Sequence, residues 1–373
     1  MKLSLLEDLV CPACAGTLAL DPPTGDPAAE VTQGWLTCGG CSERFPVIKG
    51  VPRMLLGELR QGLHCGYPEF FRGAGDTPAA TNDPSLRAQL ATMQSFGYEW
   101  REFSDIRPEG EAGFRWYFET NPPETLRGKT ILDVGCGKGR HLFYAAQAAH
   151  KVIGVDLSPA VDAAFANTGH LPNAHVVQAD VFRLPLRPAA FDMVYSLGVL
   201  HHLPDPEAGF RTMLRHARPG ADVLVYLYWS LDDEPRWKRR LLAAVTQLRK
   251  LTVRMPFPLL KAFALVAAVG CDLVFVIPHR ILRNTRWRPF AETLPLKSYA
   301  DSPFIVLYQD QFDRFSAPIE HRYSRAEVET WFMRAGLKHV QILRGAGWRA
   351  CGRLALPPDA LSDGTGRGSS LRL

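Results

Sequence analysis

Three alternate glycines, Gly135, Gly137 and Gly139, directly follow the apolar run Ile131–Val134. Glycine has no Cβ, so such a loop can adopt positive φ angles and bring backbone N–H groups close to a ligand at the start of a helix. A second apolar run ends at Asp156, 21 residues after Gly135, where a carboxylate could accept hydrogen bonds from both hydroxyls of a ribose. The pattern therefore predicts a site for a nucleoside-bearing cofactor.

The spacing of the glycines indicates which nucleoside the loop favours. Dinucleotide-binding loops read G-x-G-x-x-G, whereas this loop reads D-x-G-x-G-x-G, with Asp133 two residues before the first glycine. A carboxylate at that position disfavours a pyrophosphate and would instead meet a cationic or amino-bearing group. S-adenosylmethionine carries an ammonium and a sulfonium beside its adenosine, so the loop favours this cofactor over a nicotinamide dinucleotide.

The motifs that follow resemble the class I S-adenosylmethionine-dependent methyltransferases, and in particular methyltransferases of type 11. Gln178-Ala179-Asp180 closes a third strand, where this family places the acid that receives the adenine amino group. Phe191–Ser196 resembles the fourth strand, and Arg218-Pro219-Gly220 turns into a fifth strand, Val223–Tyr228. The resemblance implies an α/β fold with a seven-stranded Rossmann-like methyltransferase sheet. It also implies that the cofactor is bound by Asp133, Gly135, Cys136, Gly137, Gly139, Asp156, Leu157, Asp180, Val181 and Leu197.

Two histidines, His201 and His202, follow the fourth predicted strand at the carboxyl edge of the sheet. The sulfonium is already a good leaving group, so methyl transfer chiefly requires alignment of a nucleophile, and a base is needed only when the acceptor starts protonated. We expect His201 and then His202 as candidates for this base, with helix capping or hydrogen bonding as the alternative role. The Asn/Asp-Pro-Pro-Tyr signature of amide and exocyclic-amine methylation is absent, because Tyr195–Gly198 occupies its place.

Two C-x-x-C pairs, at positions 11–14 and 38–41, are separated by 23 residues. Four thiolates with this spacing can complete a tetrahedron around Zn²⁺ and leave no open position for catalysis, so we expect a structural zinc site, with paired disulfides as the alternative. The flanking sequences at 5–10 and 45–52 resemble the small zinc-ribbon subunits that activate RNA and protein methyltransferases. The predicted zinc ligands are Cys11, Cys14, Cys38 and Cys41.

Positive charge is concentrated between Arg236 and Lys297, where thirteen Lys and Arg residues are opposed only by Asp272 and Glu292. This segment has a surplus of eleven positive charges, whereas the whole chain carries +5, so the remainder is net acidic by six. Within the segment, Leu259–Ile277 approaches the roughly 20 apolar residues that cross a bilayer. An internal Asp costs about 2.5 kcal/mol or more at the centre of a membrane helix, and we therefore do not expect a membrane span.

Three interpretations of this basic and apolar insert remain open. The first is a helical hairpin that covers the catalytic mouth and leaves its basic side in water. The second is contact with an anionic membrane surface or a lipid-linked substrate, because basic residues beside an apolar face suit that interface. The third, binding of RNA phosphates, is less favoured, because the aromatic residues do not alternate with the basic ones as in stacking platforms. These aromatic residues are Trp237, Phe263, Phe275 and Trp287.

The chain has 373 residues, of which 46% are hydrophobic, as in a mixed α/β protein with two or three structural units. We expect a lid, or alternatively simple packing onto the sheet, from the aromatic clusters Phe96–Trp100 and Phe114–Phe118. Ser324–Glu327 is a capping box that opens a helix, and Leu337–Leu343 and Trp348–Leu354 form the final antiparallel strands. The expected organisation is a zinc ribbon at 1–56, a linker at 57–95, a methyltransferase core at 96–229, a helical insert at 230–319, the last helix and strands at 320–357, and a disordered tail at 358–373.

The expected function is transfer of a methyl group from S-adenosylmethionine to an oxygen or carbon nucleophile of a small-molecule or lipid-like acceptor. One alternative is an rRNA or tRNA methyltransferase, and another is a non-catalytic regulator that uses its cofactor and ribbon to dock a partner methyltransferase. Met1-Lys2 leads straight towards the first cysteine pair, so no targeting peptide is expected. Free thiols beside a zinc ribbon indicate the reducing cytoplasm, with a peripheral position at the inner face of the membrane as a further option.

Overall fold

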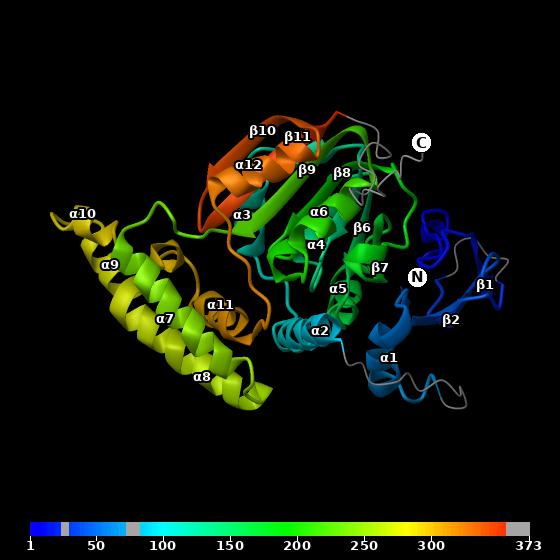
Figure 1. Ribbon diagram of the computed structural model, residues 1–373, viewed down its shortest axis with the longest axis horizontal. Coiled ribbons are helices and arrows are strands. Elements are labelled where there is room, and N and C mark those ends of the chain that lie inside the picture. Colours follow the sequence, from blue (N-terminus) through cyan, green and yellow to red (C-terminus); the bar gives the residue numbers. More distant parts are fainter. Residues whose placement is uncertain (24–29, 72–82, 356–373) are drawn as a thin grey trace, which may run out of the picture.

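The computed structural model describes residues 1–23, 30–71 and 83–355. At its centre lies a seven-stranded sheet in the order β10-β11-β9-β8-β5-β6-β7 (Figure 1). All neighbouring pairs from β9 to β7 are parallel, whereas β11 is antiparallel to β9 and β10. The predicted seven-stranded α/β fold and its final antiparallel pair are thereby confirmed. The strands are β5 (Thr130–Val134), β6 (Lys151–Asp156), β7 (Ala174–Gln178), β8 (Phe191–Leu197), β9 (Ala217–Tyr228), β10 (Leu337–Arg344) and β11 (Gly347–Leu354).

Helices cover both faces of this sheet, which explains why its parallel strands are apolar along almost their whole length. One face packs against α6 (Pro206–Leu214) and α12 (Arg325–Arg334). The opposite face packs against α3 (Gly110–Tyr117), α4 (Arg140–Ala146) and α5 (Val161–Thr168). The capping box predicted for α12 is present in full. Short 3-10 turns connect these elements at η3 (Pro123–Leu126), η4 (Val181–Arg183) and η5 (Leu200–His202).

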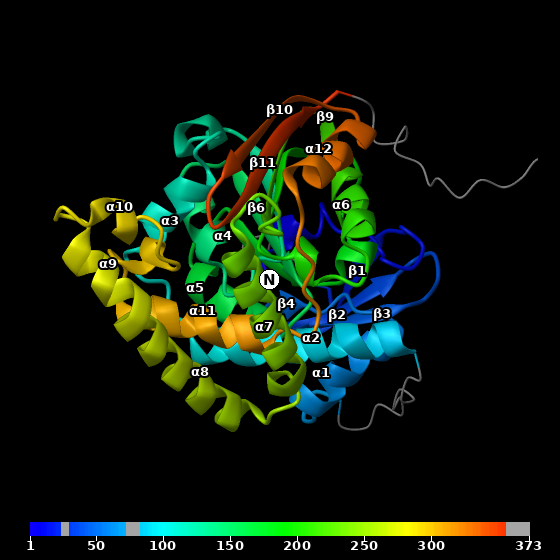
Figure 2. The ribbon, with the colours of Figure 1, turned by 60° about the vertical axis from the view of Figure 1, so that its left-hand side comes forward.

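The N-terminal ribbon forms its own antiparallel sheet, in the order β1-β2-β3-β4 (Figure 2). Its buried residues belong to the same hydrophobic core as those of the central sheet. The amide of Met54 donates to the carbonyl of Gln178 over 2.7 Å, and Arg53 pairs in parallel with the same residue of β7. The ribbon therefore covers the open edge of the large sheet, where unpaired backbone groups would otherwise face solvent. Its elements are η1 (Leu3–Leu5), β1 (Leu18–Asp21), β2 (Gln33–Cys38), β3 (Arg44–Ile48) and β4 (Val51–Pro52).

Residues 57–95, which we expected to act as a linker, contain more structure than that prediction allowed. They include η2 (Gly57–Arg60), α1 (Gln61–Gly66) and the first half of α2 (Pro84–Glu102). The reason is local: Leu55, Leu59 and Leu63 form a buried cluster, and Asp83 caps α2 by accepting from the amide of Ser85. The most linker-like stretch, 73–78, and the predicted disordered tail, 358–373, lie outside the described residues.

The insert forms a helical lobe beside the carboxyl edge of the sheet (Figures 1 and 2). Its helix α11 packs against both α8 and α2, and thereby attaches the lobe to the core. Helix α8 does not end at Asp272 but continues through a π-helical turn into α9. The elements are α7 (Arg236–Thr252), α8 (Phe257–Cys271), the π-helical turn η6 (Asp272–Val276), α9 (Ile277–Leu282), α10 (Arg288–Ala291), η7 (Lys297–Tyr299) and α11 (Phe304–Ser316).

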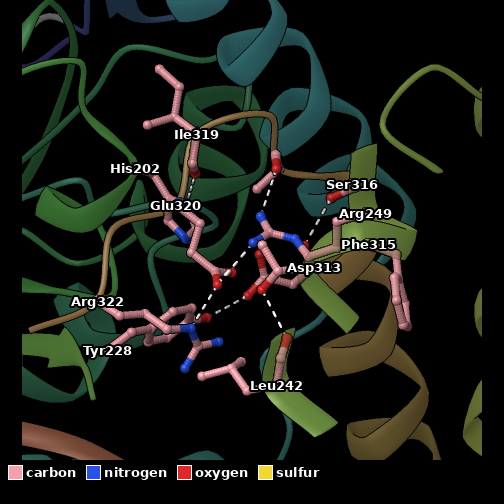
Figure 3. A network of polar contacts seen from close by, with 12 residues as sticks. His202, Tyr228, Leu242, Arg249, Asp313, Phe315, Ser316, Ile319, Glu320 and Arg322 are labelled. Carbon is pink, nitrogen blue, oxygen red and sulfur yellow. Dashed lines mark hydrogen bonds and ion pairs between the residues drawn. The ribbon is translucent and has the colours of Figure 1, made fainter. Parts of the chain in front are cut away.

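A buried ion triad joins α7 of the lobe to the chain segment that leads back into the core (Figure 3). Arg249 of α7 contacts the Glu320 carboxylate at 2.8 Å, and Arg322 contacts the same oxygen at 2.8 Å. Arg249 also donates to the carbonyl of Ala317 over 2.8 Å. The Glu320 side chain is only 4% exposed, so two guanidinium groups share one carboxylate in a region with little access to water.

We expect Glu320→Gln to lower the free energy of unfolding by about 3 to 5 kcal/mol, because it removes the only carboxylate that directly contacts the buried Arg249 among the described residues. The matched control is Glu329→Gln, which breaks an exposed pair with Arg325 and should change stability by less than about 1 kcal/mol. Urea denaturation followed by circular dichroism measures both variants. Equal stability of the two variants would show that the triad does not hold the lobe in place.

Candidate cofactor and metal sites

A pocket lies at the carboxyl ends of β5, β6, β7 and β8, where the sequence predicted the cofactor. Its floor is the glycine loop after β5, and its roof is helix α2. Of the predicted cofactor residues, Gly135, Cys136, Gly137, Asp156, Leu157, Asp180, Val181 and Leu197 line this pocket, as does His202. Asp133, Gly139 and His201 do not line it.

The glycine loop fits under its neighbours only because it lacks side chains. Gly135 has φ +84°, and a Cβ there would lie 2.2 Å from the side chain of Val199, which follows β8. Gly137 has φ +52°, and a Cβ there would lie 3.3 Å from the indole nitrogen of Trp100 in α2. The first two positions therefore meet the expectation that glycine permits positive φ and close approach.

Gly139 has a packing role that the sequence did not reveal. It has φ +80° and immediately precedes α4, and a Cβ there would lie 3.1 Å from the backbone of Ala164 in α5. The residue thus allows α4 and α5 to approach each other, and its contact with the cofactor stays a prediction.

Asp133 lies beneath the loop and is only 2% exposed. Its carboxylate accepts a hydrogen bond from the hydroxyl of Tyr195 over 2.9 Å. Burial, together with the nearby Asp156, raises the pKa of Asp133 to about 8, although the Tyr195 hydrogen bond acts in the opposite direction. Asp133 therefore lacks direct access to the pocket and can influence a ligand there only through its charge.

Asp156 ends β6 and already accepts three hydrogen bonds from its own surroundings. The amide of Gly137 donates to Oδ2 over 2.9 Å, and the amide and hydroxyl of Ser158 donate to Oδ1 over 2.8 and 2.7 Å. Burial raises the pKa of Asp156, and these hydrogen bonds lower it. A carboxylate offers about four acceptor positions, so Oδ2 keeps one for an incoming hydroxyl.

Asp180 follows β7 and caps η4 by accepting from the amide of Phe182 over 3.1 Å. The side-chain amide of Gln89, from α2, donates to the same oxygen over 3.2 Å. Burial raises the pKa of Asp180. Asp156 and Asp180 therefore come from successive strand ends and line the same pocket, as predicted.

Helix α2 supplies pocket residues that the sequence reasoning missed. Phe96 and Trp100 belong to the aromatic cluster expected as a lid, and they do line the pocket. Gly97 lets α2 approach closely, because a Cβ there would lie 2.7 Å from Pro159. The helix-start signal at Asp83-Pro84 could have revealed that the helix begins earlier. The additional lining residues are Gln89, Thr92 and Met93.

The two histidines have different surroundings. His201 is fully buried, its ring lies 3.8 Å from the ring of Tyr228, and neither of its nitrogens has a hydrogen-bond partner among the described residues. His202 borders the pocket, and its Nδ1 lies 2.6 Å from the carbonyl of Ile319 (Figure 3). A carbonyl can only accept, so Nδ1 carries the proton. Burial lowers the pKa of His202, and its neutral Nε2 is left with a free lone pair.

Carboxyl groups surround the outer end of this region. Glu99 of α2 is fully buried, and burial together with the neighbouring Asp313 and Asp310 of α11 raises its pKa well above the usual value. Asp313 accepts from the hydroxyl of Tyr228 over 3.0 Å and is close enough to His202 to oppose the lowering of its pKa. Burial likewise raises the pKa of Asp310. This side of the site therefore contains buried acids, with the cations Lys138, Arg140 and Arg314 close to them.

The four predicted metal ligands come together in the ribbon. All four Sγ atoms of Cys11, Cys14, Cys38 and Cys41 lie within 4.8 Å of one another. The Cys11–Cys41 and Cys14–Cys38 sulfur distances are 3.6 and 3.5 Å, and none of the four is in a disulfide. A tetrahedral ion with metal–sulfur bonds of about 2.3 Å places its sulfurs about 3.8 Å apart. The cluster is therefore compatible with one bound metal ion.

Comparison with curated proteins gives partial matches to RNA-modifying enzymes. tRNA U34 carboxymethyltransferases from Pseudoalteromonas translucida and Serratia proteamaculans are 32% and 30% identical over 159 and 184 residues. The alignments cover 40% and 42% of this chain, and 49% and 57% of the relatives. The chain thus spans about half the length of the curated relatives it matches.

Solved methyltransferases overlap with the chain to different extents. An S-adenosylmethionine-dependent methyltransferase from Mesorhizobium loti is 28% identical, covers 33% of this chain and 57% of its own, and has a TM-score of 0.30. One from Aquifex aeolicus is 16% identical, covers 69% and 98%, and has a TM-score of 0.38. Residues 132–225 match the methyltransferase domain family. This chain therefore contains a methyltransferase domain, and the matched residues include the glycine loop, Asp156 and Asp180.

Proposed function

We propose that this protein is an S-adenosylmethionine-dependent methyltransferase and that the pocket at the carboxyl ends of β5–β8 holds the cofactor. The observation that carries the proposal is the convergence, within a methyltransferase domain, of the glycine loop, Asp156 and Asp180 on one pocket beneath an aromatic roof. Parallel sheets bind ligands at this edge, at the point where the chain reverses its direction of strand addition. Bound cofactor would supply the electrophilic methyl group.

In this proposal, the protein chiefly orients the reactants. Oδ2 of Asp156 accepts from a ribose hydroxyl, and Asp180 with Gln89 recognises the adenine edge. Phe96 and Trp100 of α2 exclude water from above. Such alignment of a nucleophile with a methyl group can lower the barrier by about 7 to 11 kcal/mol.

The cofactor site is tested by Asp156→Ala. Loss of a charged hydrogen-bond acceptor costs about 1.5 to 3 kcal/mol, so we expect the Kd for S-adenosylmethionine to rise about 10- to 100-fold. Isothermal titration calorimetry measures it, and Asp232→Ala, in an exposed loop, serves as the matched control. An unchanged Kd in a folded Asp156→Ala protein would refute the site assignment.

The buried Asp133 gives a second test, which depends on pH. Below its pKa of about 8 the carboxyl is protonated in the free protein, so binding of a cationic ligand must first expel that proton. We expect the affinity advantage of wild type over Asp133→Asn to grow between pH 6 and pH 8, by up to about tenfold per pH unit, and to level off above pH 8. The ratio of the two association constants cancels titration of the ligand itself. A ratio independent of pH would exclude electrostatic contact with Asp133.

For the acceptor, we propose an oxygen or carbon nucleophile on an apolar, lipid-like molecule. Met93, Phe96 and Leu203 give the pocket a largely apolar wall. The carboxyl groups of Glu99 and Asp310 lie near this wall, and burial raises the pKa of both, which favours their neutral forms. Nε2 of His202 is available to receive a proton if the acceptor starts protonated.

A second candidate acceptor is tRNA, because the curated relatives are tRNA U34 carboxymethyltransferases. The basic insert could contact RNA phosphates at some distance from the acidic region. This candidate and the lipid-like acceptor make opposite predictions about where a transferred methyl group appears.

We expect that incubation of the purified chain with cell extract and isotope-labelled S-adenosylmethionine places the label in the solvent-extractable lipid fraction, as followed by mass spectrometry. Prior nuclease treatment should leave this labelling unchanged. Label that appears in the tRNA fraction and is lost after nuclease treatment would establish RNA as the acceptor. If neither the lipid fraction nor the tRNA fraction leads to formation of S-adenosylhomocysteine, the result would instead favour a non-catalytic regulator.

We also propose that the four cysteines bind one structural Zn²⁺. The sulfur separations support this assignment, as does Gly16, where a Cβ would lie 3.0 Å from Sγ of Cys38. An all-thiolate shell has no open position, so the ion would stabilise the fold and take no part in methyl transfer.

We expect about one zinc ion per chain by mass spectrometry of the metal and almost none in a Cys14→Ser, Cys41→Ser double variant. The ribbon covers β7, and metal binding supplies folding energy. Loss of the zinc should therefore also lower the thermal unfolding midpoint by several degrees. Cys271→Ser, outside the cluster, should retain both zinc and stability. Full stability of metal-free protein would contradict a structural role.

A further inference from the structure

The outer face of α8 in the helical lobe is apolar without interruption. Helices α8 and α9 form one continuous helix, Phe257–Leu282, of 26 residues with a mean hydropathy of 2.2 in its most apolar window. Only 22% of that window is buried. By length and composition this helix could cross a membrane, but its inner face packs against other helices of the same chain.

The inner face of this helix attaches it to the rest of the molecule. Its buried residues pack against α11 and the end of α2. Lys261 forms an ion pair with Glu102 of α2, and the ring of Phe257 stacks on Tyr98 at 4.5 Å. A transmembrane orientation would break these contacts. The buried residues are Leu260, Ala264, Ala268 and Val276.

From position 258 to 274 every exposed residue is apolar, and the two charged residues of this range, Lys261 and Asp272, are half-buried. Val266 is 72% exposed, Leu273 61% and Val274 59%. A monomeric soluble protein rarely exposes a contiguous apolar strip of this length. The outward residues are Pro258, Leu259, Ala262, Leu265, Val266, Val269, Gly270, Leu273 and Val274.

Helix α7, which precedes α8 in the lobe, is amphipathic on its exposed side. One exposed row is apolar, with spacings of three and four residues, and consists of Trp237, Leu241, Ala244, Leu248 and Leu251. A neighbouring exposed row is basic and includes Arg236, Arg239, Arg240 and Lys250. This combination of an apolar stripe and flanking cations is typical of helices that lie in the membrane interface.

Cations also stand at both ends of the α8 strip. Lys250 and Arg254 precede it, and Arg286 and Arg288 follow it, all of them exposed. The long side chains can place their charges in the headgroup layer while the strip contacts acyl chains. Because the rest of the chain is net acidic, only this lobe would be attracted to an anionic surface.

We propose that the lobe α7–α9 docks the protein on an anionic lipid bilayer, with α8 lying in the plane of the interface. A nucleic acid would match the charges but would leave the aliphatic strip in water, since bases stack on aromatic rings rather than on valine and leucine. The proposal does not require the methyl-transfer assignment. Helix α2 both lines the pocket and contacts the lobe. Docking of the lobe would therefore bring the pocket close to the lipid surface.

The test is flotation of the full-length protein with vesicles of phosphatidylcholine alone, or of equal parts phosphatidylcholine and phosphatidylglycerol. We expect binding to the anionic vesicles that weakens in high salt. A Val266→Asp, Leu273→Asp double variant should lower partitioning at least about tenfold, and so should Lys250→Glu with Arg286→Glu. The matched controls are Met333→Asp, at an apolar site 67% exposed on α12, and Lys338→Glu on the core.

Circular dichroism and S-adenosylmethionine affinity in solution establish that the variants are folded, and they report separately on the cofactor proposal. Absence of wild-type binding to anionic vesicles would overturn the membrane proposal. So would a wild-type dimer in analytical ultracentrifugation that the Val266→Asp, Leu273→Asp variant dissociates, because the strip would then be a self-association surface. Vesicle binding that persists in the aspartate variant but is displaced by RNA would identify a nucleic-acid surface instead.

Discussion

The close approach between the glycine loop after β5 and the turn after β8 determines where the site lies. β5 and β8 are neighbours, but the chain continues to β6 on one side and to β9 on the other. Their loops consequently diverge and leave a crevice at the carboxyl edge. A Cβ on Gly135 would lie 2.2 Å from Val199, so any side chain there would push these loops apart and deform the crevice.

The walls of this crevice depend on contacts that close the sheet at its edge and above. The ribbon pairs with β7 at Gln178 and shares the core of the large sheet. Arg53 of the ribbon forms a buried ion pair with Asp162 in α5, the helix that follows the Asp156 loop. Direct contacts thus join the ribbon to α5 and to β7, two of the elements that carry loops of the pocket.

The helical lobe is linked to the site by apolar packing of α8 and α11 against α2, and by polar contacts with the segment 317–322. The Arg249–Glu320 pair anchors α7 to the segment 317–322, and the carbonyl of Ile319 in that segment orients His202 (Figure 3). Displacement of α7 would move the hydrogen bond that fixes the His202 tautomer. A shift of the lobe could thus change the orientation of His202 at the pocket. The outer apolar face of α8 takes no part in these contacts.

The sequence by itself determined which segments form the parallel strands. It also predicted the roles of the glycine loop, Asp156, Asp180 and the four cysteines, because these signals are local in the chain and have fixed spacing. Only the tertiary structure decided that Gly139 serves helix packing, that Asp133 lies beneath the pocket, and that His202 rather than His201 borders it. It also brought Gln89 to Asp180, across 91 residues. Such outcomes depend on which helix packs against which loop, and no local pattern of residues encodes that contact.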